Sequence, residues 1–213
     1  MMLVEDVMQA AVITITPKTS LPEAMRLLRN RGIRHLPVVA NDTLVGIVSD
    51  RDLKRAMASS ATSLEAHELR HLLDALTVDE IMTRAVITVG RTFPIEEAAR
   101  LMVKEKVSAL PVTELGRLVG IVTETDVLEL FVKGMGAGEP SSRIDVRLAD
   151  EGSALADLVH RVEDARVEIS SIMTLRDRSG HKDVVIRVRT IDPRAAVARL
   201  DARGYTVRDP RRG

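Results

Sequence analysis

The chain lacks several side chains on which common protein functions depend. It contains no cysteine and no tryptophan, and its only aromatic residues are Phe93, Phe131 and Tyr205. Without cysteine there is no disulfide framework, no thiolate nucleophile and no cysteine-ligated zinc site. With three aromatic rings, a platform that stacks nucleic-acid bases is almost unavailable, and the core must be built from aliphatic side chains and methionine.

Net charge and long apolar runs are missing as well. The 213 residues carry 31 basic and 31 acidic side chains, and neither the part before Ser142 nor the part after it has the basic excess of a nucleic-acid-binding protein. No segment is apolar over the length of a membrane span, and the N-terminus has no basic leader of a secretory signal. We therefore expect a cytoplasmic protein with no nucleic-acid or membrane partner. A content of 45% hydrophobic and 29% charged residues predicts a globular chain of one large or two small domains.

The sequence does contain an internal repeat. The segment Leu44–Leu53 returns 74 residues later as Leu118–Val127, and the longer stretches 5–53 and 79–127 match without a gap at 18 of 49 positions. This extent of identity indicates a duplicated unit. The pattern of each copy predicts strand, helix, strand, strand, helix, with the first strand along the matching Ala-Val-Ile-Thr segments.

The first helix of copy one has clear boundary signals. Ser20 and Glu23 form a capping box around Pro22, and Gly32 follows a basic last turn. Copy two has Pro94 in place of Ser20, so we expect its helix to lack that cap.

Each repeated decapeptide carries a hydroxyl residue followed three positions later by an aspartate. The pair is Ser49 and Asp52 in copy one, and Thr123 and Asp126 in copy two. Two interpretations stay open, and both can hold. The two side chains can cap the N–H groups of the following helix. At the mouth of a cleft they can also bind a phosphorylated sugar, with the hydroxyl facing phosphate and the carboxylate accepting from ribose hydroxyls.

These two ordered copies, each with Leu-Pro-Val ahead of its decapeptide, resemble the paired CBS motifs of a Bateman module over about residues 4–134. The resemblance divides the first part of the chain into motif 1 (1–60), a helical insert (61–76) and motif 2 (77–134). It implies a pseudo-twofold disk with two clefts, a homodimer, and binding of AMP, ADP or ATP. Such a module regulates an attached or partner protein and is not an enzyme.

Carried over to this sequence, the resemblance builds each cleft from both copies. The first cleft would use the Thr123 hydroxyl for phosphate and Asp126 for ribose, with the base and phosphates enclosed by Ala11, Val12, Ile13, Ile33, Arg34 and His35. The second would use Ser49 and Asp52 with Ala85, Val86, Ile87, Val107, Ser108 and Ala109. Arg34 and His35 are replaced by Ser108 and Ala109 in the second set, so only the first cleft offers a nearby cation and an imidazole. We expect the first cleft to be the occupied one; the alternative is that Arg34 and His35 are solvated rim residues.

The segment between the copies contains a competing motif. Leucines at helical spacing predict a helix, and within it His67-Glu68-Leu69-Arg70-His71 fits the His-Glu-x-x-His pattern of zinc hydrolases. Such a site also needs a third protein ligand and an enclosing scaffold, and the next segment already belongs to copy two. A zinc hydrolase is therefore a remote alternative, and we expect no metal and no catalytic residue.

After a linker at 135–142, residues 143–213 follow a different order. Apolar spacing predicts strands at 144–148, 167–175, 184–188 and 205–208, with helices at 153–165 and from Asp192 to Gly204. This βαββαβ order is that of a ferredoxin-like unit.

The βαββαβ order, together with Asp150 and Leu155, resembles an ACT domain, a ligand-sensing module of amino-acid metabolism. Ser153 stands where the ACT effector loop often has glycine, which leaves amino-acid binding open. Dimerisation through sheet edges or helices is the alternative role.

The whole chain, classified as α/β (α+β), resembles accessory proteins of acetoin utilisation. The leading hypothesis is a regulatory protein that senses adenosine nucleotides for acetoin or related carbon metabolism, acting on an unknown partner. The second is a dimerisation and interaction scaffold with empty clefts.

Overall fold

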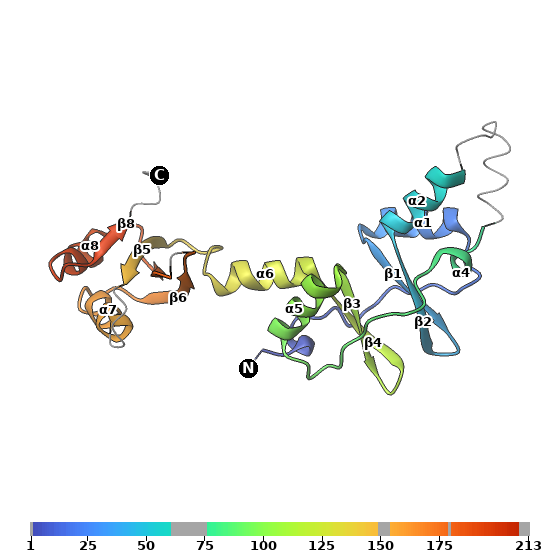
Figure 1. The fold of residues 1–213 in the computed structure, drawn as a ribbon, viewed down its shortest axis with the longest axis horizontal. Helices are drawn as coiled ribbons and strands as arrows, with labels where there is room; N and C mark the ends of the chain where they lie inside the picture. Colours follow the sequence, from blue (N-terminus) through green and yellow to red (C-terminus); the bar gives the residue numbers. More distant parts are fainter. Residues whose placement is uncertain (1, 61–75, 149–153, 179, 209–213) are drawn as a thin grey trace. The chain divides into compact units, whose positions relative to one another are not determined.

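The computed structural model describes residues 2–60, 76–148, 154–178 and 180–208. The chain divides into two units, Met1–Val127 and Leu128–Gly213 (Figure 1). The first unit holds both repeated decapeptides. The predicted helical insert at 61–76 lies outside the described residues, apart from Leu76.

The two copies of the repeat fold into the same order of elements (Figure 1). Copy one forms η1 Val4–Asp6, α1 Leu21–Arg31, β1 His35–Ala40, β2 Thr43–Ser49 and α2 Asp50–Ser60. Copy two forms α4 Val78–Ile81, α5 Ile95–Glu105, β3 Ala109–Glu114, β4 Arg117–Thr123 and α6 Glu124–Gly134. The predicted helix, strand, strand, helix of each copy is therefore confirmed.

The prediction of a strand ahead of the first helix in each copy is wrong, because the structure describes both segments and has no full strand in either. The structure has one parallel bridge per copy instead, between Ile15 and Val38 and between Val89 and Val112. In copy one the chain then reaches Pro17, which has no N–H group to extend a ladder. Each opening strand is thus reduced to pairing at a single residue.

The boundaries of the first helix in each copy follow the predicted signals. The Ser20 Oγ accepts a hydrogen bond of 3.4 Å from the Glu23 N–H, which is one half of the predicted capping box, and Gly32 ends α1 in the left-handed region at φ 62°. Helix α5 follows Pro94, which provides no side-chain cap, as expected. Lys106 ends α5 in the same left-handed region, at φ 56°.

Each copy contributes a two-stranded antiparallel hairpin that brings its polar turn beside the start of the preceding strand. His35 pairs with Ser49 across β1 and β2, and Ala109 pairs with Thr123 across β3 and β4. The hydroxyl residues of the decapeptides therefore lie next to the residues that open β1 and β3.

The opening segment of copy one packs on copy two. The Val4 N–H donates to the carbonyl oxygen of Phe93 at 2.9 Å, and Gln9 and Ile121 exchange two backbone hydrogen bonds of 2.9 and 3.0 Å. Val4 is completely buried. The first residues of the chain thus help to complete the second copy.

The opening segment of copy two makes the reciprocal contacts with copy one. The Val78 N–H donates to the Thr19 carbonyl at 2.9 Å, and Ile47 and Thr83 exchange bonds of 3.0 and 2.9 Å. The core of copy one accordingly includes two residues of copy two, and comprises Ile15, Leu21, Ala24, Leu28, Leu36, Val38, Val48, Leu53, Val78 and Met82. The two copies therefore exchange their opening segments.

The glycine of each decapeptide contacts a methionine from the opening segment of the other copy. A Cβ added at Gly120 would collide with the Met8 sulfur, and one at Gly46 would collide with the Met82 sulfur. These matched contacts explain why a glycine interrupts each β-branched strand.

The second unit is a four-stranded antiparallel sheet with two helices. Its sheet order is β6-β7-β5-β8, and β5 is hydrogen-bonded to both β7 and β8. Its elements are β5 Ser142–Leu148, α7 Ala154–Glu163, β6 Ile169–Arg176, β7 Lys182–Val188, α8 Arg194–Asp201 and β8 Thr206–Arg208. The predicted βαββαβ order of a ferredoxin-like unit is confirmed.

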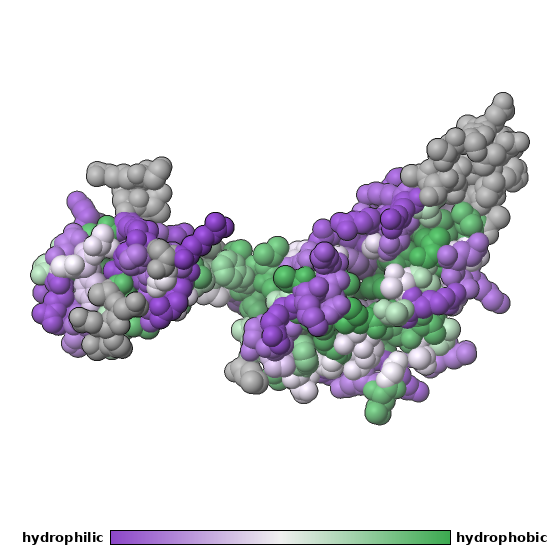
Figure 2. Space-filling view, viewed as in Figure 1, coloured by the Kyte–Doolittle hydropathy of each residue, from purple (hydrophilic) through white to green (hydrophobic). Residues whose placement is uncertain are grey.

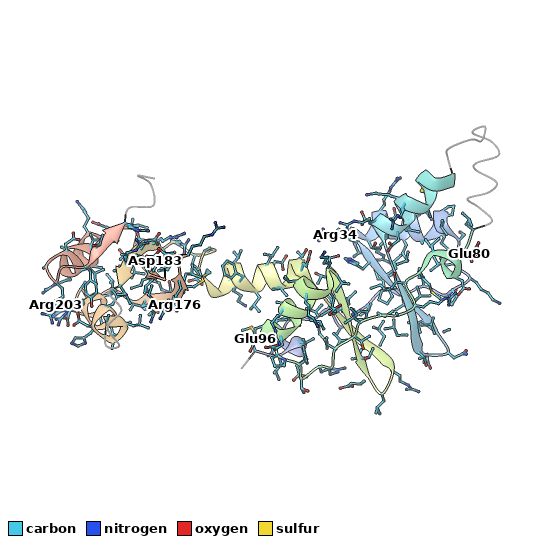
Figure 3. All side chains as sticks on the ribbon, in the orientation of Figure 1. Arg34, Glu80, Glu96, Arg176, Asp183 and Arg203 are labelled. Atoms are coloured by element: carbon cyan, nitrogen blue, oxygen red, sulfur yellow. The ribbon has the colours of Figure 1, made fainter. Side chains whose placement is uncertain are left out.

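Alternation along the strands of the second unit separates two faces. Alternate residues of β5 and β7 contribute to one core with the helices, although Val185 of β7 is buried as well. The core comprises Ile144, Val146, Leu148, Leu158, Val162, Val184, Ile186, Val188, Ala196 and Leu200. Arg147, between two of these core residues, pairs with Asp177 and with Asp183, both at 2.9 Å; Asp183 is labelled in Figure 3. Asp150 and Ser153, which carry the comparison with an ACT effector loop, lie outside the described residues.

Candidate functional site

A cavity of about 510 Å³ lies within the first unit. This volume is in the range of sites that hold small molecules. Residues of both copies line it, namely Gln9, Ala11, Val12, Ile13, Gly32, Ile33, Arg34, His35, Ile121, Thr123, Thr125 and Asp126. The structure thus brings together all eight residues predicted for the first cleft.

Thr123 and Asp126 form a reciprocal cap at the start of α6. The Thr123 N–H and hydroxyl each donate to Asp126 Oδ2 at 2.7 Å, and the Asp126 N–H donates back to Thr123 Oγ1 at 3.3 Å. This geometry confirms the capping interpretation of the hydroxyl and aspartate pattern. The other carboxylate oxygen, Oδ1, accepts a hydrogen bond of 3.3 Å from Gln9 Nε2.

The cap limits what the Thr123 hydroxyl can give to a ligand. A hydroxyl has one proton to donate, and here that proton is directed to Asp126. A phosphate that takes this proton must replace the Asp126 interaction, whereas the Thr123 N–H can keep its bond to the carboxylate. Asp126 Oδ1 still has lone-pair capacity for a sugar hydroxyl beside Gln9.

Arg34 is the cation of the cavity, and it projects from the turn ahead of β1 (Figure 3). Its Nη2 donates to Thr125 Oγ1 at 2.8 Å, across from one copy to the other. A guanidinium has five N–H donors, so this bond leaves others for an anionic ligand.

His35 is half-buried and lies between the two predicted clefts. Its Nε2 is 2.9 Å from the Ser108 Oγ, so a residue of the first cleft contacts a residue of the second. Burial, and then the neighbouring Arg34 charge, lower the pKa of His35 below its ordinary value of 6.5, against the opposing carboxylates of Asp50, Asp52 and Glu124. At neutral pH the imidazole is therefore mainly uncharged, and Arg34 carries the positive charge.

The residues predicted for the second cleft occupy the repeat-related positions. Ser49 and Asp52 form the same cap, with bonds of 2.8, 2.6 and 3.3 Å. Of the remaining predicted residues, Ala109 is buried and Ala85 is exposed. The others are partly exposed, namely Val86, Ile87, Val107 and Ser108.

Four residues of the cavity wall were not in the prediction. Ile121 and Thr125 both lie in the repeated decapeptide, so the repeat gave some signal for both. Gly32 was recognised only as a helix end. Gln9 had no local signal, since its contact with Asp126 spans 117 residues.

The described part of the chain offers neither a metal-binding cluster nor a membrane-spanning helix. Within it, no cluster of three or more His, Cys, Asp or Glu side chains could hold a metal ion. No helix there is long and apolar enough to cross a membrane. His67, Glu68 and His71 of the zinc motif lie outside the described residues.

Comparison with protein families matches the CBS domain twice, at residues 4–59 and 78–133. The chain is 37% identical over 142 residues to a CBS domain-containing protein of Dictyostelium discoideum, covering 66% of this chain and 98% of that protein. It is 41% identical over 117 residues to an inosine-5'-monophosphate dehydrogenase of Korarchaeum cryptofilum, covering 54% of this chain but only 21% of that enzyme.

Solved structures of CBS-domain pairs resemble the first part of the chain. A CBS domain pair in complex with 5'-methylthioadenosine and S-adenosyl-L-methionine is 34% identical, with a TM-score of 0.54 over 62% of this chain and 97% of that one. A CBS protein in complex with AMP is 32% identical, with a TM-score of 0.51 over 62% and 96%. A protein of Vibrio cholerae described as an acetoin utilization protein is 33% identical, with a TM-score of 0.55 over 65% and 96%.

Proposed function

The chain belongs to the CBS-domain family, and from this membership we propose that it is a regulatory protein that binds an adenosine nucleotide in the cavity between its two CBS motifs. The observation that carries the proposal is the convergence of Asp126, Thr123 and Arg34 on one cavity from both copies. Asp126 would accept from the ribose, and Arg34 would face the phosphate.

The ligands of the related structures support an adenosine-containing molecule. One holds AMP, and another holds 5'-methylthioadenosine and S-adenosyl-L-methionine. The apolar side chains of Val12, Ile13 and Ile33 would enclose the base without aromatic stacking. AMP, ADP and ATP are the nucleotides proposed, and the protein acts on a partner instead of catalysing a reaction.

The second unit supports a finer proposal about the pathway. We propose that its βαββαβ fold is an ACT-like module, and that the protein regulates acetoin or related carbon metabolism. The support is the topology of the sheet and the similarity to the Vibrio cholerae protein.

We also propose that the protein is a homodimer that uses α6. Leu128, Phe131 and Val132 are 62, 52 and 49% exposed and recur at helical spacing. Figure 2 shows hydrophobic surface over α6. A second copy presenting the same stripe would cover it by an isologous contact.

Calorimetry of the full chain with AMP, ADP and ATP tests nucleotide binding. We expect the parent to bind at least one of them and Asp126→Ala to weaken binding in the cavity by at least about tenfold. Asp52→Ala removes the same cap from the second predicted cleft, so it should leave binding in the cavity unchanged and alter only binding at the second cleft. A parent protein that binds none of the three would overturn the proposal and favour a scaffold with empty clefts.

A further inference from the structure

The repeat adds two cations to the second site of the module. The cavity wall includes Gly32 and Thr125. At the offset of 74 residues the corresponding positions hold Lys106 and Arg51. On the family resemblance we expect a cation in the first cleft only. The cleft residues that the resemblance implies include neither Lys106 nor Arg51.

The two sites have matching backbones, so corresponding residues occupy corresponding places. The Asp50 N–H donates to the Arg34 carbonyl at 3.0 Å, and the Glu124 N–H donates to the Ser108 carbonyl at 3.1 Å. The two hydroxyl and aspartate caps agree within 0.1 Å in each of their three hydrogen bonds. Lys106 and Arg51 are therefore placed around Asp52 as Gly32 and Thr125 are placed around Asp126.

Lys106 has an unusual backbone conformation for a lysine. Its φ of 56° is close to the 62° of Gly32 at the same point of the other copy. A side chain with a Cβ is disfavoured in this left-handed region, and helices most often end there on glycine. A role for the lysine side chain would explain why it occupies a position that glycine adopts at lower conformational cost.

The two sites differ in the charge that they present. In the cavity, Arg34 is opposed by Asp126 and is already bonded to Thr125. In the other site, exposed lysine and arginine side chains, Lys106 and Arg51, occupy the positions that correspond to Gly32 and Thr125, and among the residues that the structure describes neither cation takes part in an ion pair. By repeat position, the site of Asp52 therefore has two cations where the cavity has Arg34 alone.

We infer that the two sites take adenosine ligands of different charge: the site of Lys106, Arg51 and Asp52 takes a polyphosphate such as ATP, and the cavity takes an adenosine ligand with one phosphate or none. This inference rests on the proposed function, since it divides adenosine ligands between the two sites of the same module. A triphosphate gains from each additional cation within reach, whereas a monophosphate can satisfy its charge with Arg34 alone.

Calorimetry with ATP, AMP and 5'-methylthioadenosine at matched ionic strength tests the inference. The full chain is used with the cavity inactivated by Asp126→Ala, and Asp126→Asn provides a second background that keeps a side-chain acceptor for the helix cap. Lys106→Gly and Arg51→Thr then give the site of Asp52 the residue types that the cavity has at Gly32 and Thr125. Lys106→Gly also relieves the left-handed strain, so loss of folding does not obscure its effect.

We expect the two substitutions together to weaken ATP binding by at least about tenfold and to change AMP binding by less than about threefold. Arg117→Thr is the matched control, because it also removes one positive charge. Arg117 begins β4, about 20 Å along the strand from Thr123 at its other end. In the complementary Asp52→Ala background, AMP or 5'-methylthioadenosine should bind at least as tightly as ATP.

Two results separate this inference from the proposed function. If the parent binds none of the three ligands, the proposed function fails and the inference fails with it. If the parent binds, but Lys106→Gly with Arg51→Thr affects ATP no more than Arg117→Thr does, only the division of ligands between the sites is overturned.

Discussion

Single side chains in this module serve both the fold and the proposed binding site. The carboxylate of Asp126 uses Oδ2 to cap α6 and keeps Oδ1 beside Gln9 on the cavity. Because the cap fixes the rotamer of the aspartate, a ligand would not have to order that side chain on binding. Because Asp126 both caps α6 and lines the cavity, its substitution would affect the helix and the site together.

His35 predicts a pH dependence of stability. Its pKa is lowered in the folded protein, mainly by burial, so between that lowered value and about 6.5 the unfolded chain binds more protons than the folded one. The free energy of unfolding should therefore decrease as the pH falls below about 6.5, and recover above it. Denaturant unfolding between about pH 7.5 and pH 5 measures this effect.

His35→Gln is the informative variant, because an amide can keep a hydrogen bond to Ser108 without titrating. The pH dependence of its unfolding should be shallower than that of the parent. Equal slopes in the two proteins would show that His35 does not contribute.

At the scale of elements, the strands of the two decapeptides depend on a glycine that faces a methionine. Gly120→Ala would push its Cβ into the Met8 sulfur and toward the Gln9 carbonyl. We expect a loss of about 1–3 kcal/mol in unfolding free energy, since overpacking forces side chains or backbone to shift. Chemical denaturation measures the loss.

Gly90→Ala is the control for Gly120→Ala. Nothing lies within 4 Å of a Cβ added at Gly90, and its φ is not in the left-handed region. This variant should unfold within about 0.5 kcal/mol of the parent or be slightly more stable. A similar destabilisation of both variants would contradict the packing explanation.

The elements could be predicted from the sequence wherever their signals are local. Ser20 and Gly32 mark the ends of α1, alternating apolar residues mark β5, and a β-branched run marks β7 of the second unit. The composite cavity could be predicted from the family resemblance, because it depends on motif positions. The contribution of Gln9 could not, since it depends on a hydrogen bond to a residue 117 positions away.

The exchange of opening segments is also invisible in the sequence. A 74-residue repeat has the same pattern of identities whether Met8 packs on Gly46 of its own copy or on Gly120 of the other. Only the three-dimensional contacts distinguish the two pairings. The strands predicted ahead of the first helices are single bridges in the structure for a similar reason. A β-branched segment predicts an extended backbone, but it does not show how many residues of a neighbouring strand are available to pair with it.

At the scale of the whole molecule, the exposed stripe of α6 predicts assembly. The parent should sediment as a dimer at micromolar concentration, and Phe131→Glu should shift it toward the monomer, because the substitution would place a charge in an apolar contact. Analytical ultracentrifugation measures this shift.

Glu129→Gln, on the same helix but outside the stripe, is the control and should remain dimeric. A monomeric parent, or a Phe131→Glu variant that stays fully dimeric, would show that α6 is not the dimer contact.

The exchanged opening segments also determine how the module could be divided. A chain cut between residues 61 and 75 gives two pieces, and each carries the segment that completes the other, with Val4 on one and Val78 on the other. Neither piece has a complete core of its own, so the CBS portion of each should remain unfolded alone. Mixed together, they should recover the fold by fragment complementation, which would make the module a split reporter whose reassembly needs no added dimerisation tag.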